Sequence, residues 1–309
     1  MKVKFTETKL VQFESTDKLL LPGMLFEPKT KTNKVAINLH GNGSSSVFYS
    51  FERAESMARN LNEKSISFFT FNNRGAHYIK KLKINNEKKE EIKIGTAFEL
   101  IKDCIKDIDG AINFLEQLGY SEFYLIGHST GANKICVYNY YRPNNKISRY
   151  VLLGGGDDTG IYYNQICSKD KFEKYLDKAK KQVDKGNGRK LVPKYMADYI
   201  FSYQSFYDTC NPNGDYNTFP FNEYINNLKL STKPLFKEYE SIKKPTLVIY
   251  GGNDEYCWGD VRHIINILKN ATPNKSQFDF KIMEGADHGF DGYEEELSGL
   301  VARWLSEKR

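Results

Sequence analysis

The 309-residue sequence contains few cysteines, and they form no recognisable pattern. There are five, an odd number, scattered along the chain without a C-x-x-C pair. A disulfide framework and a zinc site are therefore not expected, and the reducing cytoplasm is the compartment that such cysteine usage favours. The positions are Cys104, Cys136, Cys167, Cys210 and Cys257.

Signals for membranes and nucleic acids are missing as well. The N-terminal stretch MKVKFTETKLVQFESTDKLLLPG alternates polar and apolar residues and lacks the continuous apolar segment of a signal peptide. No apolar run approaches the roughly 18 to 20 residues that a membrane-spanning helix needs. Lys and Arg exceed Asp and Glu by only 45 − 39 = 6, with both signs interspersed. We therefore expect neither a membrane nor a nucleic-acid partner.

What the sequence does contain is a regular alternation of apolar strands and amphipathic helices. Residues 34–41 form a short apolar run that ends in glycine, and a helical pattern over 48–61 follows it. The same order returns later, where apolar residues recur at helical spacing over 101–115 before the run FYLIG. This rhythm predicts an α/β fold with a mostly parallel central sheet and helices on both faces.

Two segments interrupt that rhythm. Residues 76–97 are dense in both charge signs and are expected to form a solvent-exposed excursion, such as a hairpin. Residues 159–235 contain 14 Phe and Tyr in 77 positions, about 18%, against 14% for the chain, which is too apolar for a linker. We expect a core formed by residues 1–158 and 236–309, with residues 159–235 inserted as a mainly helical cap.

The stretch YLIGHSTGA places Ser129 between two glycines, after an apolar strand and before a helical pattern. A serine on a sharp turn between strand and helix is exposed to substrate, and the tight backbone requires small neighbours. Gly127 and Gly131 meet that requirement. The pattern therefore indicates a nucleophilic serine, although any strand-to-helix turn could contain the same five residues.

A nucleophilic serine needs a histidine as base and a carboxylate that orients it. Asp254 follows the apolar run LVIYGGN and His288 follows FKIMEGAD, in the chain order serine, acid, histidine. Open α/β sheets place their sites at such strand ends. Asp157 and Asp158, after an earlier strand, remain alternative acids. Three other histidines are not expected to act as the base: His77, His128 and His263.

The reaction also requires backbone donors for the oxyanion. We expect one from the N–H of Thr130 and the other from the loop HGNG, with Asn42 as the donor. The alternative for HGNG is a phosphate-binding turn, but neither the lysine of a P-loop nor a complete G-x-G-x-x-G is present.

Together these motifs make the chain similar to the α/β-hydrolases. One departure concerns the loop after the fourth strand, where many members have D-x-R-G-x-G-x-S and this chain has NNRGAHYI; Arg74 is expected to be structural. The matching segments are NLHGNG (38–43), FNNRG (71–75), LIGHSTGA (125–132), VIYGGNDE (248–255) and GADHGF (285–290).

The expected function is that of a serine hydrolase that cleaves a carboxylic ester or thioester through an acyl-enzyme on Ser129. The substrate would be a small acyl compound, and neither a metal nor a cofactor is implied. Aromatic residues of the cap, Tyr199, Tyr203 and Phe206, would line the pocket and favour an apolar or aromatic acyl group, unless they only pack the cap. An acyltransferase or cyclase with the same residues and a non-catalytic binding protein remain alternatives, and the oligomeric state is open.

Overall fold

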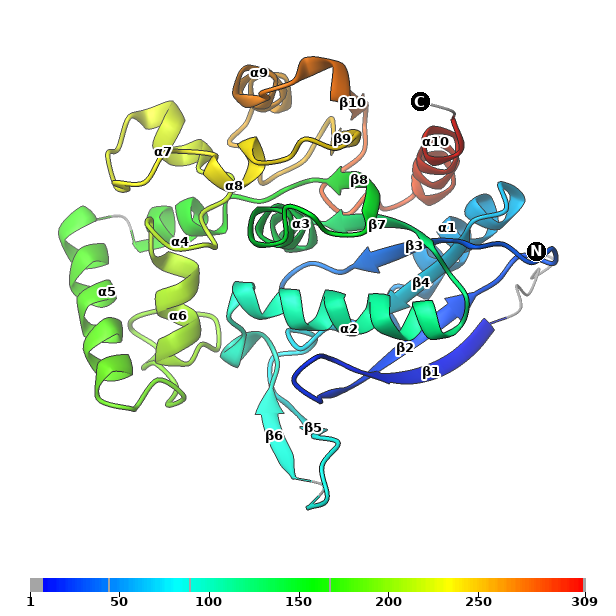
Figure 1. Ribbon diagram of the computed structural model, residues 1–309. Coiled ribbons are helices and arrows are strands. Elements are labelled where there is room, and N and C mark those ends of the chain that lie inside the picture. The colour runs from blue at the N-terminus through cyan, green and yellow to red at the C-terminus, as the bar shows by residue number, and fades with distance from the viewer. Residues whose placement is uncertain (1–7, 44, 89, 167, 308–309) are drawn as a thin grey trace.

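A computed structural model describes residues 8–307 except 44, 89 and 167. Its centre is an eight-stranded sheet with the strand order β1-β2-β4-β3-β7-β8-β9-β10 (Figure 1). The strands are β1 (Thr8–Glu14), β2 (Leu20–Phe26), β3 (Lys34–Leu39), β4 (Ser67–Phe71), β7 (Glu122–His128), β8 (Ile147–Leu153), β9 (Thr246–Gly251) and β10 (Phe278–Met283).

The sheet is parallel from β4 to β10, and only the edge pairs β1·β2 and β2·β4 are antiparallel. The central strands are largely apolar, as expected for strands whose two faces are both covered. In β7, for example, Leu125 packs into one hydrophobic cluster, and its neighbours Tyr124 and Ile126 pack into the other. The predicted fold class is confirmed. The alternation of polar and apolar residues at the N-terminus predicts a strand over residues 2–14, of which residues 8–14 form β1 and residues 2–7 lie outside the described part.

Helices cover both faces of this sheet. Helices α1 (Phe51–Glu63) and α10 (Glu294–Ser306) supply buried residues to one cluster. Helices α2 (Cys104–Gln117), α3 (Thr130–Tyr141) and α9 (Val261–Ala271) supply buried residues to the other. Figure 1 shows α1 and α10 together on one side of the sheet. No helix within the described residues is long and apolar enough to cross a membrane.

The charged stretch after β4 forms the predicted hairpin. Strands β5 (Lys80–Lys83) and β6 (Glu91–Ile94) pair antiparallel and extend away from the main sheet (Figure 1). Two 3₁₀ turns, η1 (Thr96–Phe98) and η2 (Ile101–Asp103), lead back from the hairpin into α2. A third, η3 (Lys275–Gln277), precedes β10. The hairpin thus returns the chain directly beside the sheet's carboxyl edge.

The aromatic segment contains helices and a hydrophobic cluster of its own. Helix α5 (Lys169–Asp184) contributes Phe172 to this cluster, where it packs with Phe201 and Phe206 apart from the clusters of the sheet. The stretch from Leu191 to Ser202 is irregular, closed by a single bridge between these two residues. The helices are α4 (Asp158–Ile166), α5 (Lys169–Asp184), α6 (Tyr203–Cys210) and α7 (Phe221–Asn226), and α8 (Lys237–Glu240) follows.

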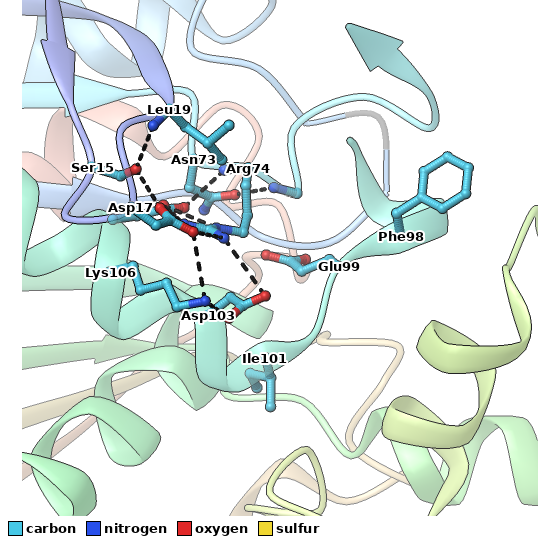
Figure 2. A network of polar contacts seen from close by, with 12 residues as sticks. Ser15, Asp17, Leu19, Asn73, Arg74, Phe98, Glu99, Ile101, Asp103 and Lys106 are labelled. Atoms are coloured by element: carbon cyan, nitrogen blue, oxygen red, sulfur yellow. Dashed lines mark hydrogen bonds and ion pairs between the residues drawn. The ribbon is translucent and has the colours of Figure 1, made fainter. Parts of the chain in front are cut away.

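Arg74 holds the loop after β4 in place through ion pairs and hydrogen bonds, which supports the structural role expected for this residue. Its guanidinium group lies 2.8 Å from Asp17 (Figure 2). The same group lies 2.7 Å from Asp107, and the backbone N–H of Arg74 also donates to Asp107. Burial acts to raise the pKa of Asp17, but hydrogen bonds from Arg74 and Ser15 outweigh it and lower the pKa to about 2. Arg74 therefore joins this loop to α2 and to the β1–β2 turn, away from Ser129.

Candidate active site

Ser129 occupies the single-residue turn between β7 and α3. Its backbone has φ 55° and ψ −127°, a conformation that is rare for any residue other than glycine. Such a conformation costs about 1–3 kcal/mol and persists only where the surroundings enforce it. The neighbouring strand β8 and the helix ahead both hold it here, since Ser129 N–H donates to the carbonyl of Leu153 and its own carbonyl accepts from the N–H of Ala132.

The glycines on either side of Ser129 are required by close backbone contacts. A Cβ atom on Gly127 would lie 2.3 Å from the carbonyl oxygen of Gly131, and one on Gly131 would lie 2.2 Å from the carbonyl oxygen of Leu39. Gly41 is also restricted, though less tightly, because its Cβ would lie 2.9 Å from the Cβ of Ser129. The sequence argument for small residues at these positions therefore agrees with the packing.

Asp254 and His288 meet at the carboxyl ends of β9 and β10. The ring Nδ1 of His288 lies 3.0 Å and 3.1 Å from the two carboxylate oxygens of Asp254, which is buried. Because the carboxylate only accepts, Nδ1 carries the proton and Nε2 is left as the acceptor. Gly154, with φ 53°, leaves room for this pair, because a Cβ there would lie 3.2 Å from the imidazole.

A cavity of about 360 Å³ brings Ser129 and His288 together. Within the described part of the chain the serine hydroxyl makes no hydrogen bond to the histidine ring. Hydrogen bonds of this kind are often formed only when substrate is bound. The same cavity is lined by Asn42 and Gly43 of the HGNG loop, so the loop expected to supply an oxyanion donor faces the serine.

Thr130, the second expected donor, is the first residue of α3, so its N–H has no acceptor within the helix.

The HGNG loop is held by two side chains that the sequence argument did not identify, Thr96 at one end and His40 at the other. The Thr96 hydroxyl lies 2.6 Å from the carbonyl oxygen of Gly43 and 2.8 Å from that of Gly75. Thr96 comes from the turn after the hairpin, so no local motif could have indicated it.

His40 fixes the other end of the HGNG loop. Its Nδ1–H donates to the Gly41 carbonyl at 2.8 Å, and its Nε2 accepts the N–H of Asn73 at 3.2 Å. Burial, reinforced by the charge of Lys134, lowers the pKa of His40 to about 3, so the ring is neutral. A neutral ring is the only form that can donate on one side and accept on the other.

The backbone around His288 is held at two points. His128 Nε2 lies 2.7 Å from the His288 carbonyl oxygen, and the His288 N–H lies 3.1 Å from the Glu255 carboxylate. Burial, with the nearby His288 ring, lowers the pKa of His128 to about 3. Glu255 was missed by sequence reasoning, although its position directly after Asp254 was the available signal.

The two alternative acids lie in different surroundings. Asp157 is buried, and its two oxygens accept the backbone N–H groups of Gly160 and Asn222. Asp158 instead lines the cavity and accepts a hydrogen bond from the Thr130 hydroxyl at 3.2 Å. Neither is hydrogen-bonded to His288 within the described residues, whereas Asp254 is.

Of the three aromatic residues expected to contact substrate, Tyr199 lines the cavity. Tyr203 and Phe206 are not among the described residues that line it. Phe206 is completely buried in the hydrophobic cluster of α4, α5 and α6, and Tyr203 packs against that cluster. The cluster needs these rings because short helices can bury their apolar faces only against one another.

No group of three or more His, Cys, Asp or Glu side chains that could hold a metal ion occurs among the described residues. Four cysteines are free and buried, and Cys167 lies outside the described part. These four are Cys104, Cys136, Cys210 and Cys257.

The strand order, the helices on both faces and the Ser129 turn define an α/β-hydrolase fold like that of known esterases, so the resemblance seen in the sequence is confirmed. The chain belongs to the family described as "Protein of unknown function (DUF1749)", whose profile matches residues 94–306. None of the curated proteins matches the sequence.

Several solved structures share the fold at low sequence identity. Est1E from Butyrivibrio proteoclasticus, solved with ferulic acid bound, is 13% identical over 96% of this chain and 98% of its own, with a TM-score of 0.61. The Pyrococcus furiosus esterase Pf2001 is 19% identical over 97% and 90%, with a TM-score of 0.55. A 2,6-dihydroxy-pseudo-oxynicotine hydrolase is 15% identical over 97% and 67%, with a TM-score of 0.59.

Proposed function

We propose that this protein is a serine hydrolase that cleaves a carboxylic ester or thioester through an acyl-enzyme on Ser129. The observation that carries the proposal is the pairing of His288 Nδ1 with the buried carboxylate of Asp254, in a cavity shared with a serine on a strained turn. A strained backbone at one polar residue and a hydrogen-bonded histidine–carboxylate pair, both at the same cavity, are typical of active sites. The esterases and the hydrolase of similar fold are consistent with this chemistry.

The proposed reaction has two halves. Ser129 Oγ attacks the acyl carbonyl carbon while its proton moves to Nε2 of His288, whose charge Asp254 stabilises. The N–H groups of Asn42 and Thr130 donate to the developing oxyanion. Collapse of this intermediate breaks the bond to the alcohol or thiol, which leaves with the proton from Nε2. Water then attacks the acyl-enzyme by the same route and releases the acid and Ser129.

We further propose that residues 1–158 and 236–309 form the catalytic core and that residues 159–235 act as a cap over it. The separate hydrophobic cluster of α4 to α6 supports this division, as does Tyr199 in the cavity lining. A cytoplasmic location is consistent with the free, buried cysteines. No cofactor takes part in the proposed steps.

The proposal is tested by labelling the purified protein with a fluorophosphonate probe and by assaying a panel of acyl esters and thioesters. We expect covalent labelling that disappears in Ser129→Ala and turnover of at least one member of the panel. If Ser129 of the folded protein is not labelled, this proposal fails and the alternative of a non-catalytic binding protein takes its place. Labelling with acyl transfer to an added amine or alcohol, but not to water, would replace hydrolysis with acyl transfer.

A further inference from the structure

The cavity at Ser129 contains a carboxylate that the proposed reaction does not use. Asp158, the first residue of α4, accepts a single hydrogen bond within the described residues, from the Thr130 hydroxyl to Oδ2. The other oxygen, Oδ1, has no donor there, and no lysine or arginine of the described chain forms an ion pair with it. A carboxylate at a cavity wall with an unused oxygen is available to a ligand.

Neighbouring charged groups do not neutralise Asp158, because each has a partner of its own. Lys134, a buried cation whose charge acts on Asp158, forms an ion pair with Glu99 at 2.5 Å. His288 is occupied at Nδ1 by Asp254. Burial raises the pKa of Asp158 to about 6, which still leaves the carboxylate mostly ionised at neutral pH. A partly buried anion without a paired cation is costly, and a cationic ligand offsets that cost.

Three tyrosine rings line the same cavity. Tyr162 and Tyr199 contact each other edge to face with their centroids 5.8 Å apart, and Tyr256 packs edge to face on His288 at 4.7 Å. They come from α4, from the irregular stretch before α6 and from the loop after β9, so three segments converge. Among the described residues, no lysine or arginine lines this cavity. Aromatic faces attract cations, most strongly where water is excluded.

We propose that the substrate of this site is a cationic ester, whose ammonium group binds to Asp158 and the tyrosine rings while its carbonyl lies at Ser129. The proposal rests on the hydrolase function proposed above and narrows its substrate class. Thr130 directly follows Ser129 in the chain and donates to Asp158, so the ammonium group lies close to the scissile bond. A purely apolar acyl group would fit the rings but would desolvate Asp158 without compensation.

The test compares esters that have the same shape but different charge. One pair is the phenyl esters of β-alanine and butanoic acid, where an ammonium group replaces a methyl group on the acyl side. The other is acetylcholine and its neutral carbon isostere, which places the charge on the alcohol side. With the full chain near neutral pH, we expect kcat/KM to favour the cationic member of at least one pair by about tenfold or more, the effect of one charge pair. Equal values in both pairs would overturn the proposal.

Two substitutions locate the cause of the preference. Asp158→Asn should reduce the ratio of kcat/KM between cationic and neutral ester by about tenfold, whereas Glu63→Gln, an exposed carboxylate of α1, should leave the ratio unchanged. Should Asp158→Asn fail to fold, Tyr199→Leu and Tyr199→Phe serve instead, because Tyr199 is exposed. Phenylalanine keeps the cation-binding face and should keep the ratio, whereas leucine should lower it. If Tyr199→Phe lowers the ratio as much as Tyr199→Leu, the Tyr199 hydroxyl acts by hydrogen bonding to a neutral group, and the ring face does not bind a cation. That result would overturn the proposal.

Binding to the Ser129→Ala variant separates this proposal from the hydrolase function. Calorimetry with the two members of each pair measures affinity without turnover. Tighter binding of the cationic member supports the proposal even if the fluorophosphonate probe leaves Ser129 unlabelled, in which case only the hydrolase function fails. Labelled Ser129 with equal affinities for both members leaves the hydrolase function in place and overturns the cationic substrate.

Discussion

The imidazole Nε2 of His128 lies 2.7 Å from the backbone carbonyl oxygen of His288. His128 is the last residue of β7, directly before Ser129, and the bond therefore links the strand that carries the serine to the loop that carries the proposed base. Burial lowers the pKa of His128 to about 3, so the ring is neutral and has one N–H, which it donates here. The bond makes His128 a positioning residue for His288.

This linkage predicts that His128→Phe lowers kcat by about tenfold with little change in KM, since a displaced base slows proton transfer more than substrate binding. His128→Gln, which retains an N–H donor, should recover part of the loss. The measurement is steady-state kinetics on an ester that the wild-type chain hydrolyses, with thermal melting as the control. Unchanged kcat in a folded His128→Phe variant would contradict the positioning role.

Ser129 should be essential for turnover and unfavourable for stability. Ser129→Ala is expected to lower kcat by at least about a thousandfold without loss of the fold. Ser129→Gly should be equally inactive but more stable than Ser129→Ala by about 1 kcal/mol, because glycine adopts φ 55° without strain. Urea unfolding of the two variants checks the difference. Retention of a tenth of the wild-type turnover in Ser129→Ala would exclude Ser129 as nucleophile.

Substitution of Asp254 and Asp157 should have opposite consequences. Asp254→Asn loses the acceptor for His288 Nδ1 and should lower kcat by about a thousandfold, with a smaller effect on stability. Asp157→Asn turns an amide N–H group toward a backbone N–H and should destabilise the fold by about 1–3 kcal/mol. Kinetics and urea unfolding of both variants test this. The reverse ranking in kcat would transfer the role of the acid to the earlier strand end.

A methyl group should be tolerated at one helical glycine and not at another. Gly131→Ala places its Cβ 2.2 Å from the Leu39 carbonyl oxygen and should destabilise the protein by about 3 kcal/mol or prevent folding. Gly299→Ala in α10 meets nothing closer than 3.4 Å and should be neutral or stabilising by up to about 1 kcal/mol. Comparable melting temperatures for the two variants would show that the turn is less tightly packed than described.

The neutral state of His40 predicts a pH dependence of stability. Its pKa is about 3 when folded and 6.5 as the ordinary value, so between these limits the unfolded chain binds a proton that the native chain does not. His40 therefore reduces stability as pH falls, by about 1.4 kcal/mol per pH unit. Because Asp157, Asp158 and Asp208 have raised pKa values and act in the opposite sense, the test is a difference. His40→Gln should remove this slope relative to wild type in urea unfolding, and parallel curves would contradict it.

Much of the architecture could be predicted from the sequence because it depends on local pattern. The strand and helix periods are properties of neighbouring residues, and they predicted the parallel sheet with helices on both faces. The density of charges predicted the hairpin within residues 76–97. The turn at Ser129 could also be predicted, because the spacing of Gly127 and Gly131 reflects a close approach of the backbone between residues that are only a few positions apart. Ser129, Asp254 and His288 could be proposed as one site because each directly follows a predicted strand, and the sites of open α/β sheets lie at such strand ends.

Contacts between distant segments were decided only by the tertiary structure. Thr96 reaches the Gly43 carbonyl across 53 residues, and His128 reaches the His288 carbonyl across 160. Composition could not tell that Tyr199 faces the cavity while Phe206 is buried among helices, since both are aromatic and seven positions apart. Nor could composition tell that Asp158 keeps an oxygen without a donor, within the described residues, in the cavity of Ser129, while both oxygens of Asp157 accept from backbone N–H groups. The pattern of the sequence sets which faces are buried, and the packing of those faces sets which polar groups remain for a substrate.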